Sequence, residues 1–271
     1  MLSSLRPAPR VLVALATAGV VVASLVWLNA SGSVSDVLSG ARSASAGQPP
    51  LPADAAARPL AVAEPAPAGD GGFAVLQRQE GTAEPVGWDP CRPLRYVVNN
   101  EHAPPSGQYL VESAIAEVQR LTGQVFVAEG TTQEQPSDRR AAVQKDRYGD
   151  RWAPVLIVWS EPGASPGLSG PVAGYAGPQV VDGAQPDTQR YVTGQVVLDG
   201  PQLGELAAGS AGLARARGVL LHELAHLMGL DHVEDRAQLM YPSTTLLGVD
   251  FAEGDRRGLA AVSGRPCHTD W

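Results

Sequence analysis

Four residues in the last quarter of the chain have the types and the spacing of a catalytic metal site. His222 and His226 are one helical turn apart, so both imidazoles can reach one ion at about 2.0–2.1 Å. Gly229 can adopt the left-handed conformation that ends a helix, which would let His232 return to the same point. Three neutral imidazoles leave one tetrahedral position of zinc open, as in catalytic sites. We therefore expect one catalytic zinc ion on His222, His226 and His232.

Glu223 is the candidate catalytic residue. It follows His222 by one residue, so it projects about 100° around the helix, beside the metal and not onto it. Zinc lowers the pKa of a bound water to about 7, and a carboxylate there can take up the proton and pass it to a leaving group. The alternative is that the histidines are unrelated residues of a core helix. Three of the chain's five histidines fall at these spacings, which favours the zinc site.

Apolar periodicity predicts the elements that must position these residues. Strands are expected at 94–99, 124–127, 153–160 and 191–198, and helices at 106–123, 211–228 and 253–262. The run 153–160 is continuously apolar, which is typical of a central strand. The helix at 211–228 is apolar nearly all round, which predicts burial. Together they predict an α+β fold, with a mixed sheet packed on one helix and on the buried zinc-binding helix.

The N-terminal part of the chain predicts export. Residues 11–28 carry no charge, and Arg6 and Arg10 precede them, so the rest of the chain is expected outside the membrane. The length of this apolar run lies between that of a signal-peptide core and that of a spanning helix. Residues 1–28 are therefore a signal anchor or a cleaved signal peptide. The protein is expected at the cell membrane, single-pass with its catalytic domain outside, or secreted.

The remainder divides into two parts. Residues 29–86 are rich in Ala, Pro, Ser and Gly and predict a disordered linker, within which 73–76 could form an edge strand or a docking segment. Residues 87–271 predict the catalytic domain. The net charge of −8 and the lack of a basic run argue against nucleic acid as a partner. Nothing in the sequence indicates oligomerisation, so we expect a monomer.

The chain resembles a known family of zinc proteases. The run HELAHLMGLDH, residues 222–232, is similar to the metzincin signature HExxHxxGxxH, and Met240 in LMYP is similar to the Met-turn of the matrixins. The resemblance covers roughly residues 88–271. It implies that Met240 packs beneath the zinc ligands and that residues 171–180 form an antiparallel edge strand that pairs with extended substrate. Residues 242–249 would line a pocket for a substrate side chain.

The sequence also departs from relatives of this family. Some metzincins carry a tyrosine ligand two residues after the methionine, where this chain has Pro242, so Tyr241 is not expected to bind the metal. Residues 161–200 contain no histidine, so no second zinc ion is expected. Asp182 and Asp187 lie in a Gly-rich loop that could bind calcium, but their residue types favour solvated turn residues instead. Calcium is therefore possible but unsupported.

Cys91 and Cys267 are the two cysteines of the chain. An even count in an exported protein favours a disulfide between them. The alternative is that the Cys91 thiolate occupies the open position of the metal, as the propeptide cysteine of vertebrate matrixins does, although its sequence motif is absent here.

These observations predict an extracellular zinc endopeptidase that acts on polypeptides through a zinc-activated water, with Glu223 as general base and acid. Two other functions remain open. One is a zinc-binding module for adhesion or assembly without catalysis, against which Glu223 argues. The other is a metal-dependent hydrolase of a non-protein amide, because a fold does not fix its substrate.

Overall fold

The computed structural model describes residues 22–23, 49–50, 52–183, 188–244 and 248–268. Its strands are β1 (Val22–Ala23), β2 (Ala74–Val75), β3 (Leu94–Asn99), β4 (Phe126–Thr131), β5 (Val155–Ser160), β6 (Gly174–Asp182), β7 (Gln189–Asp199), β8 (Leu230–Asp231) and β9 (Ser243–Thr244). Its helices are α2 (Gly107–Thr122), α3 (Lys145–Tyr148), the 3₁₀ turn η2 (Pro166–Leu168), α4 (Gly200–Ala208), α5 (Gly212–Met228) and α6 (Glu253–Ser263).

Five strands form one mixed sheet in the order β4-β3-β5-β7-β6. The first four run parallel, and β6 pairs with β7 antiparallel at the edge. Every residue of the central strand β5 is buried, as its continuous apolar run predicts. This arrangement confirms the predicted α+β fold with its mixed sheet. It also places the edge strand that the resemblance implied at β6.

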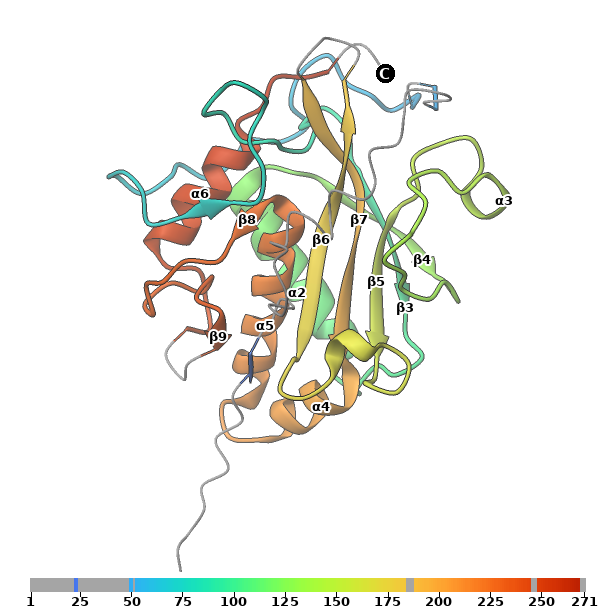
Figure 1. Cartoon of the computed structure of the whole chain (residues 1–271), viewed down its shortest axis with the longest axis vertical. Coiled ribbons are helices and arrows are strands. Elements are labelled where there is room, and N and C mark those ends of the chain that lie inside the picture. Colours follow the sequence, from blue (N-terminus) through green and yellow to red (C-terminus); the bar gives the residue numbers. More distant parts are fainter. Residues whose placement is uncertain (1–21, 24–48, 51, 184–187, 245–247, 269–271) are drawn as a thin grey trace, which may run out of the picture.

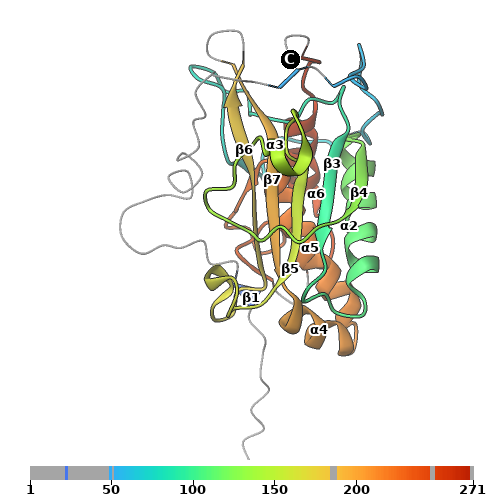
Figure 2. The same ribbon diagram turned by 90° about the vertical axis from the view of Figure 1, so that its right-hand side faces the viewer.

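Helices α2, α5 and α6 cover one face of the sheet, and α5 lies alongside β6 (Figures 1 and 2). The largest core cluster fills the space between the sheet and these helices, and α5 is buried from Gly218 to its last residue. The opposite face carries the loop between β4 and β5, with α3, seen in front of the sheet in Figure 2. The expected burial of the zinc-binding helix is therefore confirmed for the part that carries the histidines, whereas its first turns are partly exposed, Leu213 among them.

Among the longer elements, β4 and α4 differ most from the sequence expectation. Strand β4 starts at Phe126 and continues to Thr131, because its pairing with β3 extends through a register shift that apolar periodicity does not reveal. Helix α4 was not predicted, although the residues at its N-terminus are typical of the start of a helix. Asp199 accepts a hydrogen bond from the Gln202 amide at 2.8 Å, and Pro201 occupies the first turn.

Residues 52–79 lie against the domain, and we call them the N-terminal strap. Backbone hydrogen bonds join the strap to the domain from Ala56 to Cys91 and from Leu60 to Pro90. Further along, β2 pairs antiparallel with β8, so the segment 73–76 does dock as a strand. The composition of this segment did not predict its other contacts, and the domain boundary at residues 86 and 87 stays a prediction.

The predicted membrane segment lies outside the described residues, apart from Val22 and Ala23. These two residues form β1, which pairs with β9. Within the described part of the chain, no helix has the length and apolarity needed to cross a bilayer.

Candidate metal centre

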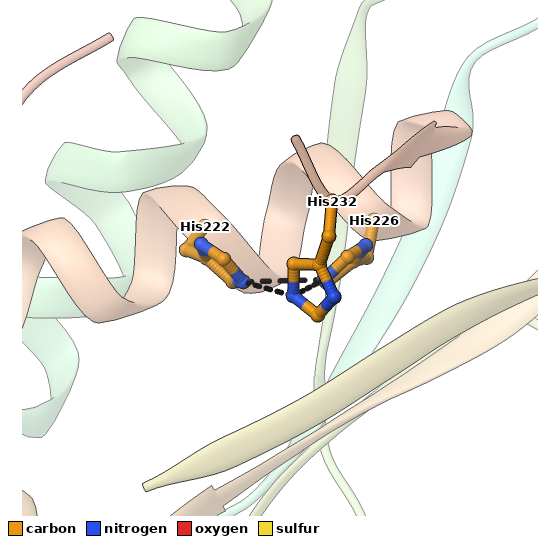
Figure 3. A group of neighbouring side chains, drawn as sticks. All are labelled: His222, His226 and His232. Carbon is orange, nitrogen blue, oxygen red and sulfur yellow. Dashed lines mark hydrogen bonds between the residues drawn. The ribbon is translucent and has the colours of Figure 1, made fainter. Parts of the chain in front are cut away.

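The three histidines predicted to bind zinc converge on one point. The Nε2 atoms of His222, His226 and His232 are 3.1 Å from one another in all three pairs. Figure 3 shows the rings of His222 and His226 on successive turns of α5, with His232 facing them from the chain that follows. Nitrogens that share one tetrahedral zinc ion at about 2.0–2.1 Å lie roughly 3.3 Å apart. The donor set therefore fits one zinc ion without rearrangement.

Backbone carbonyls fix the orientation of two of these rings. The Nδ1 atom of His222 lies 2.7 Å from the Leu239 carbonyl oxygen, and that of His226 lies 2.8 Å from the Leu230 carbonyl oxygen. Because a carbonyl only accepts, each Nδ1 carries the proton and donates it. Each Nε2 then presents a lone pair to the common point. Three lone pairs facing one another are the arrangement that a bound cation stabilises.

Burial keeps the three imidazoles neutral. It is the main cause that lowers the pKa of His222 to about 3, and the nearby His232 adds to the effect. Burial, with both neighbouring histidines, likewise holds the pKa of His226 well below its ordinary value. The pKa of His232 is lowered to about 4, also by burial. A neutral imidazole is the form that binds a metal, so the site is prepared for a cation at neutral pH.

Glu223 lies beside the histidines and is fully buried. Its side chain packs against Gly174 of β6: a Cβ atom on that glycine would lie 2.9 Å from Cγ of Glu223 and 3.2 Å from Cδ. The carboxylate therefore stands between the zinc-binding helix and the edge strand. Only glycine at position 174 leaves room for this approach. Sequence reasoning missed this residue, because an isolated glycine in a strand carries no signal of what it faces.

Gly229 ends α5 as the sequence predicts. Its φ is +111°, and its amide donates to the carbonyls of Ala225 and His226. A Cβ atom here would also lie 2.9 Å from the ring of Tyr191, so both the conformation and the packing require glycine. Beyond it, the Asp231 carboxylate accepts a hydrogen bond from the His232 amide at 2.7 Å. This sharp turn brings His232 back to the helix.

Met240 is buried in the turn 239–241, in which the Leu239 carbonyl oxygen lies against His222. Asp255 of α6 holds this turn. Its carboxylate accepts hydrogen bonds from the amides of Leu239 at 2.7 Å and Met240 at 3.2 Å. Burial raises the pKa of Asp255 above its ordinary value, although these amides oppose the shift. The carbonyl of Leu239 orients the ring of His222. By holding this turn in place, Asp255 therefore helps to position His222. Nothing in the sequence singles out this residue, because acidic residues are common in the first turn of a helix.

Cys91 and Cys267 are joined by a disulfide that ties the segment before β3 to the tail after α6. Asp89 lies close to both sulfur atoms, and such a group could resemble a metal site. A disulfide sulfur is not a thiolate, so neither cysteine is available as a ligand. The alternative role of Cys91 as a zinc ligand is therefore not the arrangement in the structure.

The structure describes only some of the remaining predicted residues. Asp182 accepts a hydrogen bond from the side chain of Gln189 at 3.1 Å, as a turn residue does. Asp187 lies outside the described residues. Of the predicted pocket wall 242–249, residues 245–247 also lie outside them, while Val249 contacts α5 at Gly218.

Comparison with known proteins gives one family match. Residues 178–263 match the family model described as Matrixin, which confirms the resemblance over the segment that carries the histidines, Met240 and Asp255. The match spans well under half of the chain. The crystal structure of archaemetzincin from Methanopyrus kandleri is similar at 16% identity and a TM-score of 0.38, over 61% of this chain and 92% of that chain. No curated protein matches the chain.

Proposed function

We propose that this protein is an extracellular zinc endopeptidase. In this proposal His222, His226 and His232 hold one zinc ion, and Glu223 transfers protons. The observation that carries it is the convergence of three neutral Nε2 atoms, 3.1 Å apart, beside a buried carboxylate. The matrixin match over residues 178–263 supports the same reading.

The edge strand supports a polypeptide substrate. β6 pairs with β7 on one side, and no other strand in the described part of the sheet pairs with its other side. An extended peptide could add to this free edge through backbone hydrogen bonds. Because Gly174 of β6 contacts Glu223, a peptide bound there would pass close to the carboxylate. Backbone recognition of this kind suits unfolded polypeptides of varied sequence.

The chain's own groups divide the work of hydrolysis. When bound, zinc supplies a Lewis acid that lowers the pKa of water and polarises a carbonyl. The carboxylate of Glu223 takes a proton from the attacking water and delivers it to the leaving amide nitrogen. The carbonyls of Leu230 and Leu239 hold the histidine rings in the tautomer that the site needs.

We also propose that the catalytic domain works outside the cell, tethered by residues 1–28 or released by their cleavage. The apolar run at 11–28 with arginines before it supports export. The disulfide between Cys91 and Cys267 supports an oxidising compartment.

The test is casein hydrolysis by the purified full chain, with and without a zinc chelator, beside a Glu223→Gln variant. We expect chelation to abolish cleavage and added zinc to restore it. The variant should lose about 10²–10⁴-fold in turnover, the range of general acid–base catalysis, and still bind zinc. Zinc-loaded, folded protein without turnover would favour the non-catalytic module. Cleavage of glycan-linked amides but not of casein would favour the non-protein hydrolase.

A further inference from the structure

The segment that carries His232 to the metal site is held by a part of the chain about 150 residues earlier in the sequence. Residues 229–231 join α5 to His232, and β8 lies within them. β2 pairs antiparallel with β8, with Ala74 opposite Asp231 and Val75 opposite Leu230. The Leu76 amide also donates to the Gly229 carbonyl at 2.9 Å. The N-terminal strap thus forms a second strand beside the turn.

Leu230 is the residue through which this pairing reaches the site. It is fully buried, and its carbonyl oxygen orients the ring of His226 at 2.8 Å. Its backbone also fixes where the chain continues to His232. A shift of Leu230 would therefore displace two of the three ligands together.

Helix α6 anchors the strap on its other side. Arg257 donates hydrogen bonds to the carbonyls of Ala68 and Gly71, at 3.1 and 3.0 Å. A Cβ atom on Gly258 would lie 2.8 Å from Cβ of Phe73 and 3.0 Å from Cδ2 of Leu230, so strap, turn and helix meet at this glycine. The strap is consequently fixed to the domain immediately before it reaches the turn. In Figure 1, β8 lies beside α6 at the end of α5.

We propose that the part of the N-terminal strap that forms β2 and ends at Leu76 is a positioning element of the metal site, and that its pairing with residues 229–231 raises zinc affinity. The inference rests on the proposed zinc site, not on peptide hydrolysis. Linkage makes the effect reciprocal: if docking of the strap raises zinc affinity by some factor, zinc binding stabilises docking by the same factor. Elements that orient metal ligands change metal affinity by about 10–100-fold when they are removed.

Two leucine-to-proline variants of the full chain separate this role from general stability. Leu76→Pro removes the amide that bonds to Gly229, and Leu60→Pro removes an amide of the same strap that bonds to Pro90, away from the turn. We expect Leu76→Pro to raise the zinc dissociation constant about 10–100-fold, measured by competition with a chromogenic chelator. Leu60→Pro and Leu76→Ala, which keeps the Leu76 amide, should stay within about threefold of the original chain.

Hydrogen exchange of the unaltered protein gives a second readout that does not depend on any variant folding. Zinc should slow exchange of the Leu76 amide by at least about tenfold, and should leave the Leu60 amide little changed. The inference is overturned if zinc leaves Leu76 exchange unchanged, or if folded Leu76→Pro binds zinc as tightly as Leu60→Pro. An unaltered chain that binds no zinc would instead overturn the proposed function.

Discussion

Each face of the sheet carries a polar cluster, and the two clusters differ in how their charges are balanced. On the helix face, three neutral histidines turn their lone pairs toward one point, and backbone carbonyls hold two of them there. On the other face, Glu134 and Arg140 form a buried ion pair with 2.9 Å between Oε1 and Nε. Tyr148 and Gln144 also donate to Glu134. The three histidines point their lone pairs at a place where a cation could bind, whereas the ion pair of Glu134 and Arg140 already contains its own cation.

This difference explains what each cluster can do. Arg140 also donates to Thr193, Gly194 and Pro154, so the ion pair fastens the loop between β4 and β5 onto the sheet. Its charges are matched within the fold, and it offers nothing to a ligand. The histidine cluster retains unused acceptors in a buried place, which is the condition for metal binding. The comparison predicts that the ion pair of Glu134 and Arg140 governs stability and that the histidine cluster governs activity.

Replacement of Arg140, the positively charged partner of the ion pair, should give the largest loss of stability. Arg140→Met leaves the Glu134 carboxylate buried without its cation, and we expect the free energy of unfolding to fall by about 3–5 kcal/mol. Urea unfolding of the full chain measures it, and zinc affinity of the folded fraction should not change. The double variant Arg140→Met with Glu134→Gln removes both charges and should recover much of the loss. Equal loss in the single and double variants would contradict the ion-pair account.

A single methyl group on the edge strand should affect activity more than stability. Gly174→Ala places a Cβ against Glu223, so the carboxylate must move. We expect turnover of casein to fall about 10–100-fold, because small displacements of a catalytic group cost that much, while zinc remains bound. Gly163→Ala is the matched control, since its nearest contact is an ordinary 3.5 Å to Glu161. Unchanged turnover in Gly174→Ala would contradict a role of the Glu223 carboxylate in catalysis.

The ion pair should also give the protein a specific sensitivity to acid, and this is the smallest of the expected effects. Burial alone would raise the pKa of Glu134, but hydrogen bonds from Arg140, Tyr148 and Gln144 outweigh it and lower the pKa. A lowered folded pKa means that the stabilisation is present above the ordinary value of about 4.3 and is lost as pH falls through the folded value. The difference in unfolding free energy between the original chain and Glu134→Gln should therefore shrink below about pH 4. A constant difference down to pH 3 would show that Glu134 is not stabilised as a carboxylate.

The sequence predicted the histidine cluster far better than the ion pair, for a physical reason. The spacing of His222, His226 and His232 on a helix and a glycine turn is local, so the distances between them follow from backbone geometry. Glu134 and Arg140 are also close in sequence, but they lie in an irregular loop whose path depends on contacts with β7. The roles of Asp255 and of the N-terminal strap likewise arise from contacts between residues far apart in the chain.

The secondary-structure elements show the same difference between features set by local sequence and features set by distant contacts. The strand at 94–99 and the helix ends at Gly123 and Gly229 agree with the sequence expectation because local chemistry decides them. Helix α4 and the extension of β4 depend on neighbours. The contact between Gly174 and Glu223 could not be anticipated, because neither residue indicates the other.

The central claim is that His222, His226 and His232 hold one zinc ion, and metal content tests it most directly. Zinc per chain would be measured by mass spectrometry after dialysis of the full chain, of His232→Ala and of His102→Ala. His232 is the most exposed of the three histidines, and His102 lies near Glu161, away from them. We predict one zinc ion in the original chain and in His102→Ala, and none in folded His232→Ala. An unaltered, folded chain without zinc, or His232→Ala with a full complement, would contradict the account.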